Sequence, residues 1–389
     1  MRVYFGVCGV GLGHVGRCIS VANDLLKRGD EVIFSTYSDA LEYVAHEGIP
    51  YLESPAIHYD VKQDGEVDFR QTTVYPGAFS ALIFLNQVSA EIKYIRSFKP
   101  HVVVSDSRAS TIVAAKLLSL PVLTILNLYR VRIPRERRFV RLAQIADGGI
   151  LTVVGRLWNM GEEILIPDFP EPYTLSEGNL GIPPWRKSRV RLVGPVLPVR
   201  RSDLPSREEL RKKLGLWDGP VIFVPISGPS QEKEYFIGKM RDILLKMPRD
   251  YQVVVSLANP EGGHQPLQSG NVTFYDWIPN RFEFLKACDI VVCRAGLGTI
   301  SQAICYGRPF LTVPTPSHTE QQNNASRAEA LGVARVLDQK RLSIEYVLSN
   351  IKEMLGEDYA ERAEQLQLET ARYDATKAIV GTIACHEAQ

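Results

Sequence analysis

Short apolar runs alternate with longer stretches in which apolar residues recur at helical spacing along most of the chain. The first run, at residues 3–9, is followed by an amphipathic helical pattern that ends at Gly29. Because strands and helices keep alternating in this way, the pattern is typical of parallel βαβ units with right-handed crossovers. In the N-terminal half, strands are predicted at 3–9, 31–36, 101–106 and 121–126.

A second strand–helix series follows a stretch, 127–191, in which the alternation weakens and prolines accumulate. We place the domain boundary at 198/199, and the helical pattern over about 359–383 can pack back on the N-terminal domain. The sequence therefore predicts an α/β protein with two doubly wound Rossmann-like domains, 1–198 and 199–389, that face an interdomain cleft. The strands of the second series are predicted at 220–228, 251–257, 272–277, 289–294 and 310–314.

The composition is that of an ordinary globular protein. Of the 389 residues, 45% are hydrophobic and 23% charged, which is enough apolar material for two cores. The net charge of +1 does not favour nucleic acid as a partner. No apolar run reaches the roughly 18–20 residues of a membrane-spanning helix, and the N-terminus reads as a core strand. The six cysteines form no CxxC pattern, so a cytoplasmic protein with reduced thiols is expected.

A glycine-rich loop, which includes Gly11 and Gly13, follows the first predicted strand and contains His14. Such a loop lets the backbone approach a ligand closely, but no convincing ribose-binding acid follows it, so a dinucleotide site is weakly indicated. His14 is either a general base at the cleft or a polar cap of its own helix. Asp106 ends another strand, and it either orients an imidazole or caps the next helix.

Small and hydroxyl-bearing residues follow strands of the second half, where a helix start would suit a diphosphate. The segment 318–324 is dense in side-chain donors and acceptors, which suits sugar hydroxyls; the alternative is a solvated helix start. The candidate diphosphate contacts are Ser227, Gly228, Ser230, Gly296, Gly298 and Thr299.

The stretch 275–325 resembles the donor-binding half of GT-B glycosyltransferases, both the plant-type UDP-glycosyltransferases and the MurG-like enzymes, and the N-terminal GxGxGH loop resembles the same superfamily. The resemblance implies that Trp277 stacks on uracil and that Ile278 contacts the base through its backbone. Arg294 stands where plant enzymes carry a phosphate-contacting histidine. Gln302 replaces their ribose-binding glutamate. The residues implied to hold the donor sugar are Glu320, Gln321 and Gln322.

The resemblance implies an inverting transfer of a hexose or N-acetylhexosamine from a UDP-sugar to a hydroxyl acceptor, with His14 as base and Asp106 as its partner. No DxD motif occurs in the chain, so neither a metal nor another cofactor is expected. Two other readings stay open: a nucleotide-sugar 2-epimerase of the same fold, and a non-catalytic nucleotide-sugar-binding protein.

Six arginines occur between Arg130 and Arg141, close in sequence to an apolar stretch at 78–85. A basic patch beside apolar side chains is what peripheral binding to an anionic membrane requires. MurG-like enzymes act on lipid-linked acceptors, so the resemblance points to the inner face of the cell membrane. The alternative is a solvated arginine-rich helix next to an ordinary core helix.

Overall fold

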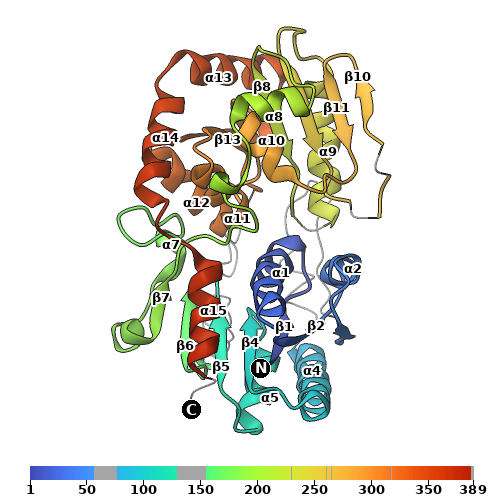
Figure 1. Cartoon of the computed structure of the whole chain (residues 1–389), viewed down its shortest axis with the longest axis vertical. Coiled ribbons are helices and arrows are strands. Elements are labelled where there is room, and N and C mark those ends of the chain that lie inside the picture. Colours follow the sequence, from blue (N-terminus) through green and yellow to red (C-terminus); the bar gives the residue numbers. More distant parts are fainter. Residues whose placement is uncertain are drawn as a thin grey trace.

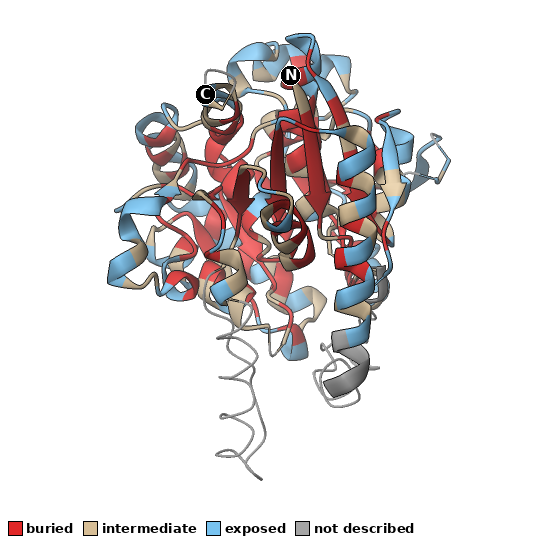
Figure 2. Ribbon diagram, turned by 90° about the horizontal axis from the view of Figure 1, so that it is seen from below, coloured by how far each residue is buried: buried red, intermediate tan, exposed pale blue. Residues whose placement is uncertain are grey.

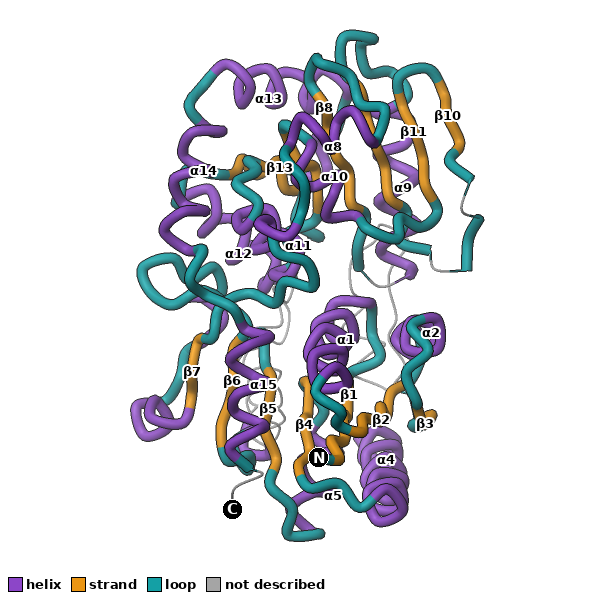
Figure 3. The backbone as a smooth tube through the Cα atoms, viewed as in Figure 1, coloured by secondary structure: helices purple, strands orange, loops and turns teal. Residues whose placement is uncertain are grey.

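The computed structural model describes residues 1–56, 77–128, 155–228, 230–259, 261–263, 265–316 and 318–386, and the side chains of 77–81, 230 and 231 are outside this description. Its described strands form two sheets of seven strands each, which occupy separate halves of the molecule (Figure 1). Helices lie around the strands of both halves (Figure 3). The predicted fold class, two doubly wound α/β units, is confirmed.

The N-terminal sheet has the strand order β3-β2-β1-β4-β5-β6-β7, and its strands pair in parallel. Its strands are β1 Arg2–Val7, β2 Glu31–Thr36, β3 Tyr51–Glu53, β4 Val102–Asp106, β5 Val122–Ile125, β6 Glu163–Ile166 and β7 Val190–Leu192. Its helices are α1 Leu12–Lys27, α2 Asp39–His46, α4 Gly77–Phe98, α5 Ala109–Leu117, α7 Glu177–Leu180 and the 3-10 turn η1 Pro184–Arg189.

Alternate side chains of the central strands supply two separate cores, because successive residues of a strand point to opposite faces. In β1, Val3 and Phe5 pack with α1 and α2, whereas Tyr4 packs with α4 and α5. Both faces are covered, so the strands read as continuous apolar runs. Figure 2 shows the buried residues gathered in the strands and the exposed residues on the outer surfaces of the helices.

The C-terminal sheet has the order β10-β11-β9-β8-β12-β13-β14, with β10 antiparallel to β11 and the other pairs parallel. Its strands are β8 Val221–Pro225, β9 Gln252–Ser256, β10 Leu267–Ser269, β11 Val272–Tyr275, β12 Ile290–Cys293, β13 Phe310–Thr312 and β14 Ala334–Val336. The helices of this half are α8 Arg207–Lys213, α9 Ser230–Leu244, α10 Arg281–Ala287, α11 Leu297–Cys305, α12 Thr319–Ala330, α13 Ile344–Gly356 and α14 Tyr359–Thr370, with 3-10 turns η2 Arg201–Asp203 and η3 Gln339–Arg341.

The helix expected over 359–383 is two helices, because the chain turns after α14 and starts again at α15, Ala375–Cys385. The Asp374 side chain caps the new helix by accepting a hydrogen bond from the Lys377 backbone N–H at 3.0 Å. The two helices separate: α14 packs on α11 of the C-terminal half, whereas α15 packs on α1 of the N-terminal half. Residues Ala375, Ile379 and Ile383 are fully buried in the N-terminal core.

The chain crosses between the two halves twice, at 193–195 and at 373–375, and these two segments lie side by side in a seam. The Val193 N–H donates to the Ile166 carbonyl at 3.0 Å, the Gly194 N–H to Asp168 at 2.8 Å, and the Ala375 N–H to Pro195 at 3.1 Å. Gly194 has φ +87, and a Cβ there would lie 2.6 Å from the Tyr373 Cβ, so both backbone conformation and space require glycine. Phe169 and Leu175, which precede the predicted boundary, are buried in the core of the C-terminal half.

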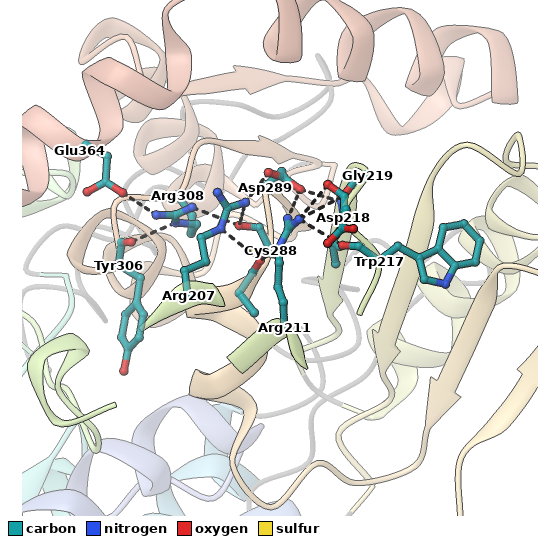
Figure 4. Close-up of polar contacts among 12 residues, drawn as sticks. Arg207, Arg211, Trp217, Asp218, Gly219, Cys288, Asp289, Tyr306, Arg308 and Glu364 are labelled. Atoms are coloured by element: carbon teal, nitrogen blue, oxygen red, sulfur yellow. Dashed lines mark hydrogen bonds and ion pairs between the residues drawn. The ribbon is translucent and has the colours of Figure 1, made fainter. Parts of the chain in front are cut away.

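An arginine-rich cluster ties α8 and α14 to the loops that precede β12 and β13 (Figure 4). Arg207 and Arg211 on α8 both pair with the Asp289 carboxylate. Arg308 donates to the Cys288 carbonyl at 3.1 Å and to the Glu364 carboxylate at 2.5 Å. Asp289 and Arg308 precede the strands β12 and β13, whereas the loops described in the next section follow their strands. The cluster therefore stabilises the C-terminal half at the ends of the strands opposite to those loops.

Candidate active site

The N-terminal glycine loop is fixed between β1 and α2. A Cβ on Gly9 would lie 2.0 Å from the Tyr37 carbonyl oxygen, so only glycine lets these two backbone segments meet. The Gly11 N–H donates to Asp39 Oδ2 at 2.9 Å, and α1 begins at the next residue, Leu12. A Cβ on Gly13 would meet no described atom within 4 Å. The loop therefore places His14 in the first turn of α1, beside open space.

The structure brings His14 and Asp106 together, although they are 92 residues apart. The His14 Nδ1 lies 2.7 Å from Asp106 Oδ1. Asp106 ends β4, which pairs with β1, so the two side chains follow neighbouring strands. The His14 side chain is 24% exposed and that of Asp106 is fully buried. Asp106 is not the N-cap of α5, because that position belongs to Arg108.

Arg17 is a third member of this cluster that the sequence reasoning missed. Its Nε donates to Asp106 Oδ2 and its Nη2 to Asp106 Oδ1, both at 2.5 Å, and Nη2 also lies 2.8 Å from His14 Nδ1. The Cys18 thiol adds a contact to Asp106 Oδ2 at 3.3 Å. The signal in the sequence is the three-residue spacing from His14, which places both side chains on one face of a helix.

Burial alone would raise the pKa of Asp106, but the charge of Arg17 and the contact with His14 outweigh burial and lower it to about 2. The carboxylate is therefore ionised at any physiological pH and can only accept hydrogen bonds. Burial likewise lowers the pKa of Arg17, but Asp106 outweighs it, with a contribution from Glu320, so the pKa of Arg17 is raised. Since Glu320 lies in the first turn of α12, the charge of a residue from the C-terminal half acts on this cluster.

The second loop surrounds the start of α11. Gly296 is its N-cap, and no described side chain caps the helix. A Cβ on Gly228, Gly296 or Gly298 would meet no described atom within 4 Å, so these glycines border open space. The Ser227 Oγ lies 3.4 Å from Thr299 Oγ1, which brings the two predicted diphosphate loops together. The side chain of Ser230 lies outside the described residues.

Arg294 lies inside the fold. Its Nη1 donates to the Val313 carbonyl at 3.1 Å and to Gln339 Oε1 at 2.5 Å, and its guanidinium lies 4.2 Å from the centroid of the Phe236 ring. Burial lowers the pKa of Arg294 to about 10, partly opposed by the charge of Glu232. The guanidinium thus stabilises the loop after β13 from inside the fold.

The three residues expected to hold the donor sugar point in different directions, because consecutive residues of a helix are about 100° apart. Glu320 is half-buried and acts on Arg17 across the two halves. The Gln321 side chain is buried and accepts a hydrogen bond from the Thr315 N–H at 2.9 Å. Gln322 is exposed. Only Glu320 of the three is tied to the His14 cluster.

Trp277 forms a ring contact between the two halves. Its centroid lies 5.5 Å from that of Tyr43 and 5.6 Å from that of His46, both on α2, in edge-on geometry. Ile278 is buried in the C-terminal core. The Gln302 Oε1 accepts from Arg281 Nη2 at 2.7 Å, and its Nε2 donates to the Val196 carbonyl at 3.3 Å. Gln302 thus holds the interdomain linker in place.

Other predicted elements lie partly outside the described residues. The arginines from Arg130 to Arg141 and the side chain of Phe79 are among them. On α4, Leu82 is 56% and Leu85 59% exposed. Among the described residues, no helix combines the length and the apolar character that spanning a membrane requires. The described residues also contain no group of three or more His, Cys, Asp and Glu side chains that could hold a metal ion.

Two Rossmann-like units with glycine loops at the ends of their strands are the arrangement of the GT-B fold. Residues 223–379 match the family model of the glycosyltransferase family 28 C-terminal domain, and residues 1–144 match that of glycosyl transferase family 1. Both halves of the chain therefore match glycosyltransferase family models, and the similarity to GT-B glycosyltransferases, including MurG-like enzymes, that the sequence indicated is confirmed.

Similar proteins cover the whole chain or half of it. An uncharacterized glycosyltransferase of Methanosarcina acetivorans is 29% identical over 97% of both chains. The UDP-N-acetylglucosamine–N-acetylmuramyl-(pentapeptide) pyrophosphoryl-undecaprenol N-acetylglucosamine transferase of Deinococcus deserti is 29% identical over 49% of this chain and 54% of its own. Among solved structures, the glycotransferase of kitacinnamycin superposes with TM-score 0.66 at 16% identity, covering 99% of this chain and 98% of its own. The spinosyn rhamnosyltransferase SpnG complexed with thymidine diphosphate gives 0.62 at 18% identity, covering 99% and 100%.

Proposed function

We propose that the protein transfers a hexose or N-acetylhexosamine from a UDP-sugar to a hydroxyl acceptor with inversion, and that His14 is the base. The observation that carries the proposal is the 2.7 Å contact between His14 Nδ1 and the ionised Asp106. A carboxylate at Nδ1 favours the ring form that keeps its proton there, so Nε2 can accept a proton from the acceptor hydroxyl. As His14 takes its proton, the hydroxyl oxygen bonds to the anomeric carbon on the face opposite the nucleoside diphosphate, whose bond to that carbon breaks. This single displacement inverts the configuration.

The leaving diphosphate is proposed to bind at the start of α11. The open space at Gly296 and Gly298, the Thr299 hydroxyl and the neighbouring Ser227 support this assignment. A helix N-terminus stabilises the negative charge that develops on the diphosphate. Trp277 is proposed to stack on the base, and Glu320 to bind sugar hydroxyls near Arg17. The donor named by the Deinococcus relative is UDP-N-acetylglucosamine, which supports uridine, whereas SpnG was crystallised with thymidine diphosphate.

A donor screen with UDP- and TDP-sugars, run with and without a chelator, tests this function. We expect metal-independent release of nucleoside diphosphate, with kcat lowered by roughly 10²–10⁴ in His14→Ala, the usual contribution of a general base. The exposed His101, whose Nδ1 accepts from the Arg2 N–H, provides the matched control His101→Ala. Conversion of the donor to its 2-epimer would identify an epimerase, and binding without turnover a non-catalytic protein. Turnover of His14→Ala within a few-fold of wild type would exclude His14 as the base.

We further propose that the acceptor is lipid-linked and that the protein binds the inner face of the cell membrane peripherally. The exposed Leu82 and Leu85 on α4 support an apolar contact, and the arginines at 130–141 supply positive charge. The Deinococcus relative is named for an acceptor on pyrophosphoryl-undecaprenol. Each well-placed arginine contributes about 1 kcal/mol at an anionic surface.

Vesicle co-sedimentation tests the membrane proposal. Binding should rise with the fraction of anionic lipid, fall with salt, and drop when Arg135, Arg137 and Arg138 are replaced by Ser. Leu82→Ser should weaken binding at every salt concentration, because it removes apolar contact without changing charge. Leu368→Ser is the matched control, since Leu368 is 73% exposed on α14. Binding that ignores lipid charge would refute the membrane proposal and favour a soluble acceptor.

A further inference from the structure

We propose that Asn324 and Asn179 are positioning residues of the donor site, because together they fix the direction of the peptide bond that precedes Gly296. This inference rests on the proposed function, which places the leaving diphosphate at the start of α11. Asn324 lies on α12 and is fully buried, and Asn179 lies on α7 and is 2% exposed. Water therefore competes little with the hydrogen bonds that these two amides make.

The two amides form a chain of hydrogen bonds whose direction is set by backbone carbonyls. Asn324 Nδ2 donates to the Ala295 carbonyl at 3.2 Å. Asn179 Nδ2 donates to the Glu320 carbonyl at 3.4 Å and to Asn324 Oδ1 at 3.0 Å, and Asn179 Oδ1 accepts from Asn323 Nδ2 at 2.6 Å. A carbonyl oxygen can only accept, so the amide nitrogens cannot exchange places with the amide oxygens. Helix α7 is thereby joined through α12 to the loop before α11.

The Ala295 carbonyl determines where the next backbone N–H points. The peptide bond between Ala295 and Gly296 is trans, and the C=O and N–H groups of a planar trans peptide point in opposite directions. Because Asn324 holds the carbonyl toward α12, the Gly296 N–H is directed away from α12. Gly296 is the N-cap of α11, and its N–H donates to no residue that the structure describes. This donor is therefore available to a diphosphate at the helix start.

Segment 168–180, which carries Asn179, has a second attachment to α12 that separates positioning from simple docking. Arg327 Nε donates to the Thr174 carbonyl at 3.1 Å and lies 3.4 Å from the Glu177 carboxylate. The Arg327 side chain is 30% exposed and takes no part in the chain of amides. Its replacement loosens the same segment but leaves that chain in place, so Arg327→Met is the matched control.

Carbonyl-edited NMR can observe the Gly296 N–H alone, because the dipeptide Ala-Gly occurs once in the sequence. Protein labelled with ¹³C-carbonyl alanine and ¹⁵N-glycine therefore gives one such signal, which is titrated with UDP and, separately, with uridine. In wild type and in Arg327→Met, UDP should shift this signal further than uridine does and should bind more tightly. Asn324→Leu should move the signal in the free protein and lower UDP affinity roughly tenfold or more, the scale of one hydrogen bond to a charged group, with little change for uridine.

Asn179→Ala decides the matter if Asn324→Leu does not fold. It leaves the Asn324 oxygen without its donor, so UDP affinity should fall about two- to tenfold, the range for one neutral hydrogen bond, while uridine affinity is kept. Unchanged UDP affinity, a loss equal for UDP and uridine, or an equal loss in Arg327→Met would overturn the inference, since none of these results comes from a turned peptide bond. A wild type that binds UDP no more tightly than uridine would instead overturn the diphosphate site of the proposed function itself.

Discussion

Replacement of Asp106 by Asn tests the buried cluster most directly, because it keeps the size of the side chain and removes its charge. Asp106 accepts hydrogen bonds from Arg17 and Cys18 and contacts His14, and it is fully buried. An Asn amide would present two donors to a site where Arg17 also donates, so one oxygen contact is lost and the guanidinium is left buried without a counterion. Breaking a buried ion pair by removing one partner costs about 3–5 kcal/mol.

The lowered pKa of Asp106 gives a second, independent value for what its charge contributes to the free energy of unfolding. The lowering from 3.8 to about 2 corresponds to about 2 kcal/mol of stability supplied by the charged form. Because the pKa in the folded state is depressed, this stability is present above the ordinary pKa of an aspartate and is lost as the pH falls toward 2. The difference in unfolding free energy between wild type and Asp106→Asn should therefore shrink between about pH 4 and pH 2.

Urea unfolding near neutral pH and at about pH 3, together with donor turnover, measures both effects. We expect Asp106→Asn to lose about 3 kcal/mol near neutral pH and roughly 10²–10⁴ in kcat. Asp24→Asn is the matched control, since Asp24 on α1 pairs with Lys27 at 2.9 Å and is 46% exposed; it should lose under about 1 kcal/mol. If Asp106→Asn were as stable and as active as Asp24→Asn, the ionised cluster would have neither role.

Three further results are expected. Trp277→Ala should weaken nucleotide binding measured by calorimetry by about 1–3 kcal/mol, the scale of one base–aromatic stack, whereas Tyr43→Ala should change it far less. Gly298→Ala should keep the unfolding midpoint of wild type, because its Cβ meets no described atom within 4 Å, yet lower diphosphate affinity about tenfold by filling the space at the helix start. Asp289→Asn should cost about 1 kcal/mol of stability by weakening the part-exposed contacts of Arg207 and Arg211, with unchanged turnover.

Most strands of both sheets could be predicted, because buried parallel strands read as apolar runs and the glycines mark where they end. The short strands β3, β6, β10 and β14 could not, since three or four residues carry little periodicity. The turn between α14 and α15 was also missed. Ala371 and Arg372 in this turn are good helix formers, whereas Asp374 caps α15, which packs on the other half of the molecule.

The candidate site likewise contains contacts that the sequence could predict and contacts that it could not. The meeting of His14 and Asp106 follows from the rule that ligands bind at the carboxyl ends of adjacent parallel strands. The positions of Arg294 and Gln302 do not, because their partners Gln339, Arg281 and Val196 are distant in sequence and come together only through packing. Family resemblance supplied a site position for each residue, but the direction of each side chain depends on these local contacts.

The seam at Gly194 bears on how this protein can be recombined with its relatives. A chimera that takes its donor half from another glycosyltransferase by a single junction at 198/199 would import a foreign α15, whose apolar side must fill the space of Ala375, Ile379 and Ile383 against α1. It would also leave the native Phe169 and Leu175 facing a foreign core. Exchange of the halves therefore needs four junctions, on either side of 168–180, at 198/199 and before Ala375, chosen together so that the hydrogen bonds at Asp168, Gly194 and Pro195 are kept.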